Sequence, residues 1–418
     1  MLSRSAIKCR SVSGALALAG LVWMVAAVDV PFAQAQTYTV LFSFKGGAAD
    51  GMNPEGGLYM NKAGDLYGTT VQGPTCKLPC SPFFGTVFRL TPAGKQAVVH
   101  HFSGDPDGAS PYGGFSAYPY GTTAGGGTSN KGVVFKLGTD NAVTVVHNFT
   151  GSPADGASPY TGLVQDPEGN LYGTTAYGGK YDNGVVFKLT AAGTETVLYS
   201  FTGGADGGIP YGNLVLNSAG TLFGTASAGG NTTGNCFPSG CGVVFSLNSA
   251  GTESVLYTFT GTSTDGANPY AGLVQDTEGN LYGTTFAGGA GSCSNGCGAV
   301  FKVDTAGAET VLYLFTGSPA DGASPYAGLV RDTSGNLYGT TAYGGPSDNG
   351  VVFKVNPAGT ETLLHTFTGG ADGAVPRSPL IMDTAGNLYG MTYNGGIAGP
   401  KCGGGPESTC GVVFKIVP

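Results

Sequence analysis

Seven copies of one short sequence pattern divide this chain into units of about fifty residues. The clearest copies read Leu-Tyr-Gly-Thr-Thr and lie at 66–70, 171–175, 281–285 and 337–341. Weaker copies lie at 119–123, 222–226 and 388–392. Their aromatic residues are separated by 53, 52, 51, 59, 56 and 51 positions. A repeat of this length, built from short strand-like pieces, is typical of a β-propeller or a related array.

The fifth copy shows what one unit contains. Its strand-like segments, rich in aromatic and β-branched residues, are 270–276, 281–285, 298–303 and 309–315. Glycine-containing turns join the first segment to the second and the third to the fourth, and a longer loop joins the second to the third. This pattern predicts one antiparallel blade of four strands. Seven units therefore predict an all-β, seven-bladed β-propeller.

The two ends of the repeat region predict how the ring closes. Thr37–Phe44 (TYTVLFSF) matches the fourth strand of a unit, and Gly411–Ile416 (GVVFKI) matches the third. The last unit therefore lacks its own fourth strand, and we expect the N-terminal strand to complete that blade in a 1+3 clasp. This arrangement leaves no long strand edge exposed. The alternative, in which strands are grouped from the N-terminus, would place the fourth-type strand innermost.

The order of motifs within each unit resembles a known family. Asp-x-x-Gly-Asn-Leu-Tyr-Gly-Thr-Thr is followed by Gly-Gly and then by Gly-Val-Val-Phe-Lys, as in 332–354. This pattern is similar to the GloVer tandem-repeat family of exported bacterial proteins, and the resemblance covers nearly all of the chain after residue 35. It implies an exported, propeller-like repeat protein, and it implies no particular reaction.

The first 35 residues have the composition of a secretory signal peptide. A basic start precedes the apolar stretch Gly14–Val28, and Ala33-Gln34-Ala35 is an A-x-A cleavage site. We expect cleavage after Ala35, a mature propeller of residues 36–418 without a transmembrane segment, and a secreted or periplasmic location. The formal net charge of −8 argues against the basic surface that a nucleic-acid-binding protein needs. We also expect a monomer without a cofactor or metal.

Eight cysteines follow the expected cleavage site, and they fall into four local pairs. The pairs are Cys76/Cys80, Cys236/Cys241, Cys293/Cys297 and Cys402/Cys410. Each pair lies between the second and third strand of its unit, where units without cysteine have shorter loops. In an exported protein these pairs predict disulfides that clip inserted loops. The alternative of metal knuckles has little support, because each loop holds two cysteines and no nearby histidine.

An Asp-Gly pair precedes the first strand of every unit. The aspartates are Asp50, Asp107, Asp155, Asp206, Asp265, Asp321 and Asp372. Seven equivalent carboxylates could ring one face and bind cations. The structural alternative, which we favour, is that each aspartate accepts hydrogen bonds from its own loop while glycine takes the positive φ. His100, His147 and His365 align with Tyr199, Tyr257, Tyr313 and Phe42, which indicates a packing slot on the outer strand and not a catalytic position.

A second set of repeated residues has a functional interpretation. Pro-Tyr follows Asp-Gly in five units and supplies Tyr112, Tyr160, Tyr211, Tyr270 and Tyr326. In the clasp arrangement these tyrosines would surround one mouth of the central channel, where they could bind a sugar or a peptide. Packing between blades is the alternative. The first and last units carry Glu55 and Arg377 instead, which predicts an ion pair or a polar notch across the seam. A surface pair should contribute about 0–1 kcal/mol.

These observations favour a secreted propeller that acts as an extracellular binding or scaffold module for a protein or glycan. The first alternative is a propeller enzyme, a lyase or hydrolase with its site at the channel mouth. The second is a structural protein of the cell envelope. No nucleophile elbow of the form Gly-x-Ser-x-Gly supports a Ser-His-Asp hydrolase. Fold class alone cannot choose between binding and catalysis, so we assign no catalytic residue.

Overall fold

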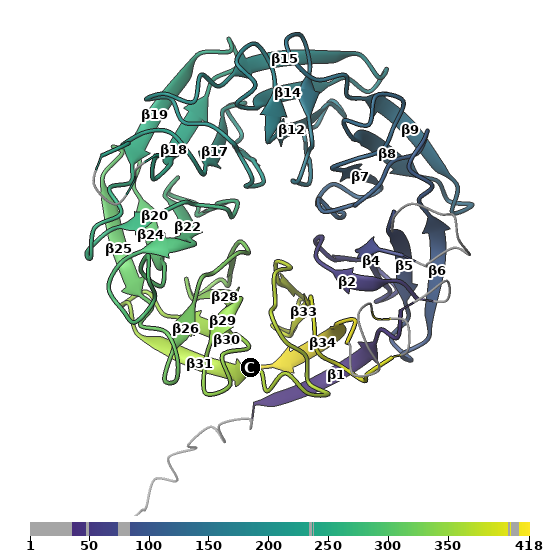
Figure 1. The fold of residues 1–418 in the computed structure, drawn as a ribbon, viewed down its shortest axis with the longest axis vertical. Helices are drawn as coiled ribbons and strands as arrows, with labels where there is room; N and C mark the ends of the chain where they lie inside the picture. The colour runs from purple at the N-terminus through teal and green to yellow at the C-terminus, as the bar shows by residue number, and fades with distance from the viewer. Residues whose placement is uncertain are drawn as a thin grey trace, which may run out of the picture. The chain divides into compact units, whose positions relative to one another are not determined.

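A computed structural model describes residues 36–46, 50–73, 84–233, 236, 238–399, 402 and 409–418. Gln36–Pro418 forms one compact unit in which seven blades surround a central axis (Figure 1). The predicted all-β, seven-bladed propeller is confirmed. Among the described residues there is no α-helix, and so none that could cross a lipid bilayer.

The strands of each blade follow one another outward from the axis. The first blade contains β2 (Met52–Pro54), β3 (Tyr59–Met60), β4 (Leu66–Gln72), β5 (Thr86–Leu90) and β6 (Gln96–His101). The second blade contains β7 (Tyr120–Thr123), β8 (Val133–Leu137) and β9 (Val143–Asn148). The third blade contains β10 (Gly156–Ala157), β11 (Val164–Gln165), β12 (Leu171–Thr175), β13 (Tyr177–Gly178), β14 (Val185–Leu189) and β15 (Glu195–Ser200). The next two contain β16 (Val215–Leu216), β17 (Leu222–Ala226), β18 (Val243–Leu247), β19 (Glu253–Thr258); and β20 (Gly266–Ala267), β21 (Val274–Gln275), β22 (Leu281–Thr285), β23 (Ala287–Gly288), β24 (Ala299–Val303), β25 (Glu309–Leu314). The last two contain β26 (Gly322–Ala323), β27 (Val330–Arg331), β28 (Leu337–Thr341), β29 (Tyr343–Gly344), β30 (Val351–Val355), β31 (Glu361–Thr366); and β32 (Ile381–Met382), β33 (Leu388–Thr392), β34 (Val412–Val417), with β1 (Thr37–Ser43) outermost.

The predicted clasp is confirmed. β1 lies antiparallel to β34 in the sheet β1-β34-β33-β32, from Thr37 opposite Val417 to Ser43 opposite Val412 (Figure 1). A bulge between Val40 and Phe42 adjusts the register. The first and last strands of the propeller therefore share one blade, and that blade closes the ring.

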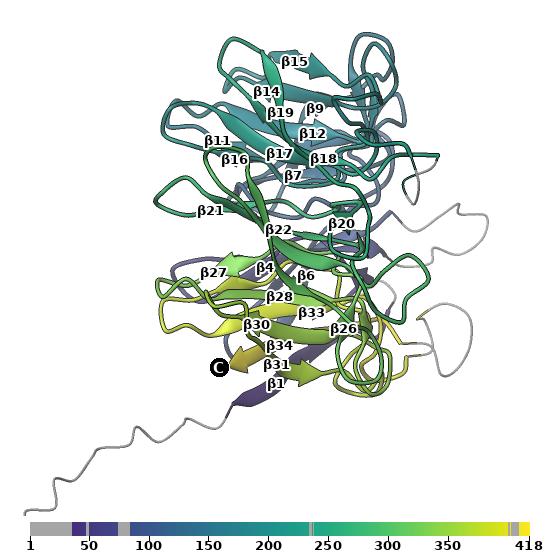
Figure 2. The same ribbon diagram turned by 90° about the vertical axis from the view of Figure 1, so that its left-hand side faces the viewer.

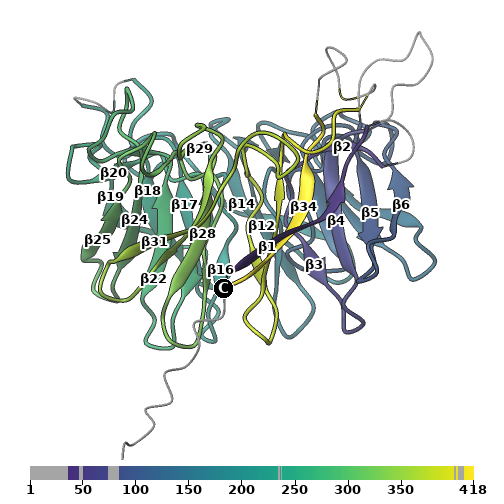
Figure 3. The ribbon, with the colours of Figure 1, turned by 90° about the horizontal axis from the view of Figure 1, so that it is seen from below.

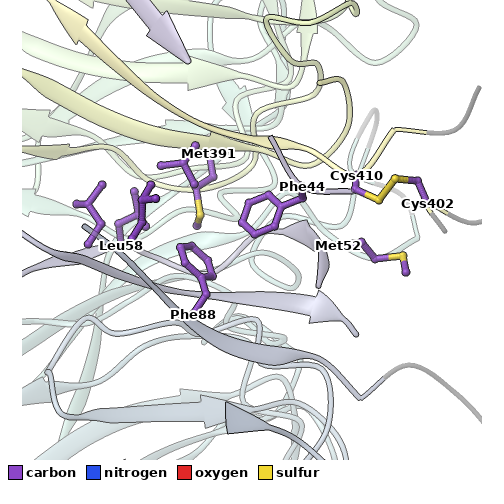
Figure 4. Close-up of a cluster of buried hydrophobic side chains, with 10 residues drawn as sticks. Phe44, Met52, Leu58, Phe88, Met391, Cys402 and Cys410 are labelled. Atoms are coloured by element: carbon purple, nitrogen blue, oxygen red, sulfur yellow. A yellow bond between two sulfur atoms is a disulfide. The ribbon is translucent and has the colours of Figure 1, made fainter. Parts of the chain in front are cut away.

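Pairs of phenylalanine rings join every blade to the next. A phenylalanine after each outer strand meets the phenylalanine in the third strand of the following blade, with ring centroids 5.0 to 5.6 Å apart. At the seam the pair is Phe44 and Phe88, which pack with Met391 and Leu58 beside the Cys402–Cys410 disulfide (Figure 4). Because such pairs bury two large rings, they dominate the cohesion between blades.

The structure gives a physical reason for the residues of the repeated Leu-Tyr-Gly-Thr-Thr motif. The leucine is buried, and the glycine leaves room for the third-strand phenylalanine, whose Cζ would lie 2.6 Å from a Cβ at Gly283. The first threonine donates to a carbonyl of the next blade, as Thr225 does to Ala271 O at 2.8 Å. The second threonine donates within its own loop, as Thr285 does to Ala287 O at 3.0 Å. The motif therefore encodes packing between blades as well as a strand.

The innermost strands are shorter than predicted. In the fifth unit only Val274–Gln275 pairs with β22, whereas the sequence predicted a strand over 270–276. The residues nearer the axis give their carbonyls to threonines of the preceding blade, so they leave the sheet ladder. The predicted 286–297 loop also contains a short strand, because Ala287–Gly288 pairs with Gly266–Ala267.

The two ends of the propeller differ in content. Tight turns between first and second strands and between third and fourth strands lie at one end, which we call the turn face. The Asp-Gly segments and the connections between second and third strands lie at the other end, which we call the loop face. Side views show β2, β20 and β29 toward the loop face and β3, β16 and β21 toward the turn face (Figures 2 and 3). Sequence variation between the units is therefore concentrated on the loop face.

Three of the four predicted disulfides are confirmed. Cys236–Cys241, Cys293–Cys297 and Cys402–Cys410 are bonded, with Cα atoms 4.8, 5.2 and 5.1 Å apart. Cys76 and Cys80 lie outside the described residues. All three bonds clip loops on the loop face, as their local spacing predicted.

Replacing both cysteines of one clip should have a modest effect on stability. We expect the Cys236→Ser/Cys241→Ser variant to lose about 2 kcal/mol, because the bond closes a very short loop in the unfolded chain. Chemical denaturation of the oxidised protein and of the variant measures this difference. Unreduced peptide mapping is the control, and a bond between cysteines of different blades would contradict the local pairing.

Candidate functional site

The seven Asp-Gly aspartates cap their own loops. Each carboxylate accepts a hydrogen bond from the backbone N–H of a residue four or five positions earlier, at 2.7 to 2.9 Å. The donors are Lys45, Ser103, Thr150, Thr202, Thr260, Thr316 and Thr368. This geometry matches the structural interpretation of Asp50, Asp107, Asp155, Asp206, Asp265, Asp321 and Asp372. These carboxylates are used within the blades and do not form a ring around the channel.

The outer-strand slot that accepts tyrosine or histidine is more polar than the sequence indicated. Tyr199, Tyr257 and Tyr313 donate their hydroxyls to the loop aspartate, and His100, His147 and His365 contact the same carboxylate through Nε2, over 2.8 to 3.3 Å. The prediction of a packing slot was therefore incomplete. Either tyrosine or histidine can occupy this slot, because both place a polar atom at the aspartate carboxylate.

One of these slots brings three potential metal ligands together. Atoms of His147, Asp155 and Glu195 lie within 4.8 Å of one another. The next interfaces have the same aspartate and glutamate with tyrosine in place of histidine, and Asp155 already accepts from Thr150 N–H and Gly156 N–H. The trio is thus one version of a repeated contact between blades, and we do not assign a metal to it.

The five Pro-Tyr tyrosines form a continuous arc at the channel mouth on the loop face. Successive ring centroids from Tyr112 through Tyr160, Tyr211 and Tyr270 to Tyr326 lie 5.1, 5.1, 5.4 and 5.6 Å apart. The arc lines a cavity of about 470 Å³, together with Glu55 and Arg377. The structure therefore brings all seven predicted binding residues into one cavity.

A local backbone turn points each of these residues toward the axis. The residue two positions before each has φ between 53 and 56°, and in two blades it is the β-branched Ile209 or Val375. The intervening proline packs on a glycine of the preceding blade, where a Cβ at Gly242 would lie 2.6 Å from Pro269 Cδ. Positive φ is costly for β-branched residues, and such strain is often found at functional sites. The tyrosine arc is thus held by packing between blades.

Glu55 and Arg377 complete the ring of residues at the seam. Arg377 Nη1 lies 3.9 Å from Glu55 Oε1, which confirms the predicted pairing across the first and last blades. The pair is not a surface pair, because the Glu55 and Arg377 side chains are only 17% and 24% exposed. The Arg377 guanidinium lies 4.9 Å from the ring centroid of Tyr326 and 4.8 Å from that of Tyr393.

Burial and neighbouring charges set the protonation states of the Glu55 carboxyl group and of the tyrosine hydroxyls in this cavity. Burial raises the pKa of Glu55 to about 7, against the opposing effect of Arg377. Burial and the nearby Glu55 raise the pKa of Tyr112 to about 12, and burial raises that of Tyr211 above its usual range. The phenols therefore remain protonated near neutral pH, and Glu55 is the one group of this arc that titrates there.

Four further aromatic residues lie next to the tyrosine arc or Arg377 and were not predicted from the sequence. Phe286 contacts the rings of Tyr270 and Tyr326, and Tyr393 contacts Arg377. Tyr177 adds to the effect of burial that raises the pKa of Tyr211, and Tyr343 is among the groups that raise the pKa of Arg377. Phe286 and Tyr393 directly follow the Thr-Thr positions, where other units carry small residues such as Ala124 or Ser227, and Tyr177 and Tyr343 lie one residue further on. Breaking of the repeat pattern at these positions was the signal that could have found them.

Asn213 lies beneath the arc. Its Oδ1 accepts from Gly162 N–H at 2.7 Å, and its Nδ2 donates to Ser116 Oγ at 3.1 Å. It therefore links its own blade to the two preceding blades across the channel. Other units have glycine or proline here, such as Gly272 and Pro379, so Asn213 is the polar side chain of this layer of the cavity.

Comparison with known proteins identifies the family. The Gloeobacter/Verrucomicrobia repeat matches residues 30–237, 85–294 and 232–402, three overlapping segments that together span most of the chain. This protein belongs to that family. The resemblance inferred from the motifs is therefore confirmed, and each matched segment covers several units of the propeller. No curated protein sequence matches the chain.

Solved structures show similarity to this member of the Gloeobacter/Verrucomicrobia repeat family at the level of fold. Virginiamycin B lyase from Staphylococcus aureus matches with a TM-score of 0.55 and 12% identity, over 92% of this chain and 99% of that one. The extracellular domain of a putative one-component system from B. thetaiotaomicron matches with a TM-score of 0.54 and 9% identity, over 90% of this chain and 40% of that one. At such identities the comparison supports the propeller fold alone.

Proposed function

We propose that this protein is an exported binding module whose ligand, a segment of an extracellular glycan or protein, occupies the tyrosine-lined cavity. The observation that carries the proposal is that five tyrosines, Glu55 and Arg377 converge on one cavity of about 470 Å³. Cavities of this size with aromatic walls and a few polar groups are typical ligand sites. Tyrosine suits this role because its ring buries apolar surface while its hydroxyl forms hydrogen bonds.

Export is part of the proposal. Residues 1–35 have the sequence features of a cleavable signal, with cleavage expected after Ala35. Three disulfides between the described cysteines are compatible with an oxidising compartment. N-terminal sequencing of the exported protein tests the cleavage site, and a mature chain that retains residues 1–35 would contradict it.

Removing two tyrosines from the centre of the arc should weaken binding strongly. We expect Tyr160→Ala/Tyr211→Ala to weaken the best ligand from a glycan and peptide array by at least tenfold, since each ring offers a large contact surface. Calorimetric titration measures the change. Tyr181→Ala is the control, because this tyrosine is 47% exposed and contacts Lys180 outside the cavity.

The array result also separates the alternatives. Equal binding by both variants would place the ligand elsewhere and contradict the proposed site. If neither glycans nor peptides bind the folded wild-type protein, the binding proposal fails and the cell-envelope structural role remains.

A lyase or hydrolase activity is the second candidate, and Glu55 is the observation that favours it. A carboxyl with a pKa of about 7 inside a cavity has the properties of a general acid or base. Incubation of a bound glycan or peptide with wild type and Glu55→Gln, followed by mass spectrometry, tests this candidate. Cleavage by wild type and not by Glu55→Gln would support an enzyme, whereas intact ligand in both samples would support a pure binding module.

A further inference from the structure

Arg377 is held as a pre-oriented cation with unused hydrogen-bonding capacity. Its guanidinium lies between the rings of Tyr326 and Tyr393, which restricts its orientation. Its Nε is buried, and among the described residues it has no hydrogen-bond partner. The 3.9 Å separation from Glu55 exceeds hydrogen-bonding distance. A guanidinium fixed in this way is suited to a planar anionic group.

Glu55 has unused capacity of the same kind. Its Oε2 is buried and, within the described part of the chain, lacks a hydrogen-bond partner. Buried polar atoms without partners are rare because they lose their hydration without compensation. Both residues line the cavity, so the loose pair sets one carboxyl group and one guanidinium group, neither fully hydrogen-bonded, against the same space.

We propose that the cavity binds an acidic sugar, with the sugar carboxylate on Arg377 and the pyranose ring against the tyrosine arc. This inference rests on the proposed binding function and names its ligand class. A carboxylate matches the guanidinium edge, and a sugar hydroxyl can donate to the Glu55 carboxyl group. The C–H face of a pyranose and its hydroxyls together fit rings that also carry phenolic O–H groups.

The channel lining favours a sugar over a peptide end. The backbone groups next to the tyrosines are already paired: Gly162 N–H donates to Asn213, and the carbonyls of Thr161 and Ala271 accept threonine hydroxyls. A bound peptide would need partners for its own amides, and these groups already use part of their hydrogen-bonding capacity within the protein. A sugar needs side-chain hydroxyls and ring faces, which the arc provides.

The cavity should become more negative as the pH rises, which weakens the binding of an anionic ligand. The ionisable groups that face Glu55 are Arg377 and four tyrosines: Tyr112, Tyr160, Tyr326 and Tyr393. The tyrosines stay neutral near pH 7, because burial raises their pKa values. At pH 6 Glu55 is mainly protonated and the cavity carries the Arg377 charge. At pH 8 Glu55 is ionised and competes with a ligand carboxylate for Arg377.

Calorimetric titration with an oligogalacturonate and with its methyl ester tests the inference on the full mature protein. We expect the acid to bind at least tenfold more tightly than the ester at pH 6, and this preference to shrink severalfold at pH 8. Arg377→Gln should remove the preference for the acid over the ester at pH 6. Arg377→Lys should restore it only in part, because lysine keeps the charge without the planar fork. Glu55→Gln should bind the acid equally at pH 6 and pH 8.

Two outcomes would overturn the inference and distinguish it from the proposed function. Equal binding of acid and ester, with both lost in Tyr160→Ala/Tyr211→Ala, would leave a tyrosine-lined binding site and reject the acidic ligand. Tight binding of a free peptide C-terminus, with an amidated peptide and the sugars inactive, would reject the sugar. Circular dichroism melting of each variant confirms that a change in affinity does not reflect unfolding.

Discussion

Deletion of residues 37–44 is expected to cost more than about 5 kcal/mol of folding free energy and to broaden or abolish cooperative unfolding. These residues supply the outer strand of the last blade and Phe44, which is fully buried against Phe88 at the seam. Loss of one buried phenylalanine alone costs about 3–5 kcal/mol. The deletion also exposes the edge of β34, so we expect aggregation on heating.

A melting curve of the deletion variant, compared with that of residues 36–418, measures this effect. Phe44→Ala and Phe149→Ala form a matched pair, because each removes one ring from equivalent contacts at the seam and between the second and third blades. Similar losses of about 3–5 kcal/mol are expected if the clasp makes the seam equivalent to other interfaces. A deletion variant that melts like the longer protein would show that β1 does not hold the ring closed.

The second large effect is a fall in stability as the pH rises from 4.5 to above 7. Four glutamates at the start of outer strands face the loop aspartate that begins their own unit, which lies beside the outer strand of the preceding blade. They are Glu195, Glu253, Glu309 and Glu361. Burial, followed by repulsion from the aspartate, raises the pKa of each to about 7. The folded protein therefore retains these protons, while the unfolded chain loses them near pH 4.5.

The sign follows from this difference in proton binding. Stabilisation from a raised carboxyl pKa is complete below about pH 4.5 and is lost as the pH rises through about 7. After discounting for solvent around half-buried groups, each site should lose on the order of 1 kcal/mol, and the four together about 4 kcal/mol. Burial lowers the pKa values of His101 and His365, which act in the opposite direction. These are two sites against the four glutamates and Glu55, whose pKa burial also raises to about 7.

Thermal melts at pH 5, 6, 7 and 8 measure the effect. Replacement of the four glutamates by glutamine should flatten the profile, because glutamine keeps the shape and cannot ionise. The capping aspartates with lowered pKa values, such as Asp155, lose their contribution only at more acidic pH and do not interfere. A wild-type melting temperature that rises between pH 5 and pH 8 would contradict the raised pKa values of these four glutamates.

Several parts of the candidate site were within reach of sequence reasoning. The Pro-Tyr positions and the substitutions Glu55 and Arg377 were visible, because a repeat makes equivalent positions comparable. Their convergence on one mouth followed once the clasp placed the first and last units together. Pairing of the local cysteines followed from spacing alone, since a bond across four to eight residues needs only a tight loop.

Other parts depended on neighbours that are distant in the sequence. The predicted surface pair of Glu55 and Arg377 is mostly buried, because Tyr326 and Tyr393 cover the guanidinium from two different blades. The raised pKa of Glu195 depends on burial and on Asp155, which lies forty residues earlier, beside the outer strand of the preceding blade. Burial and charge at such positions are sums over adjacent blades, and no single unit contains that information.

The sequence by itself determined the number of blades, the strand order and the clasp. Each of these depends on local hydrophobic pattern and turn residues, which recur at a fixed period. Only the tertiary structure decided the depth of the cavity, the second set of aromatic residues at its mouth and the protonation of Glu55. Those properties arise where side chains of all seven blades meet at the axis, and their distances and desolvation are set by the packing of one blade against the next.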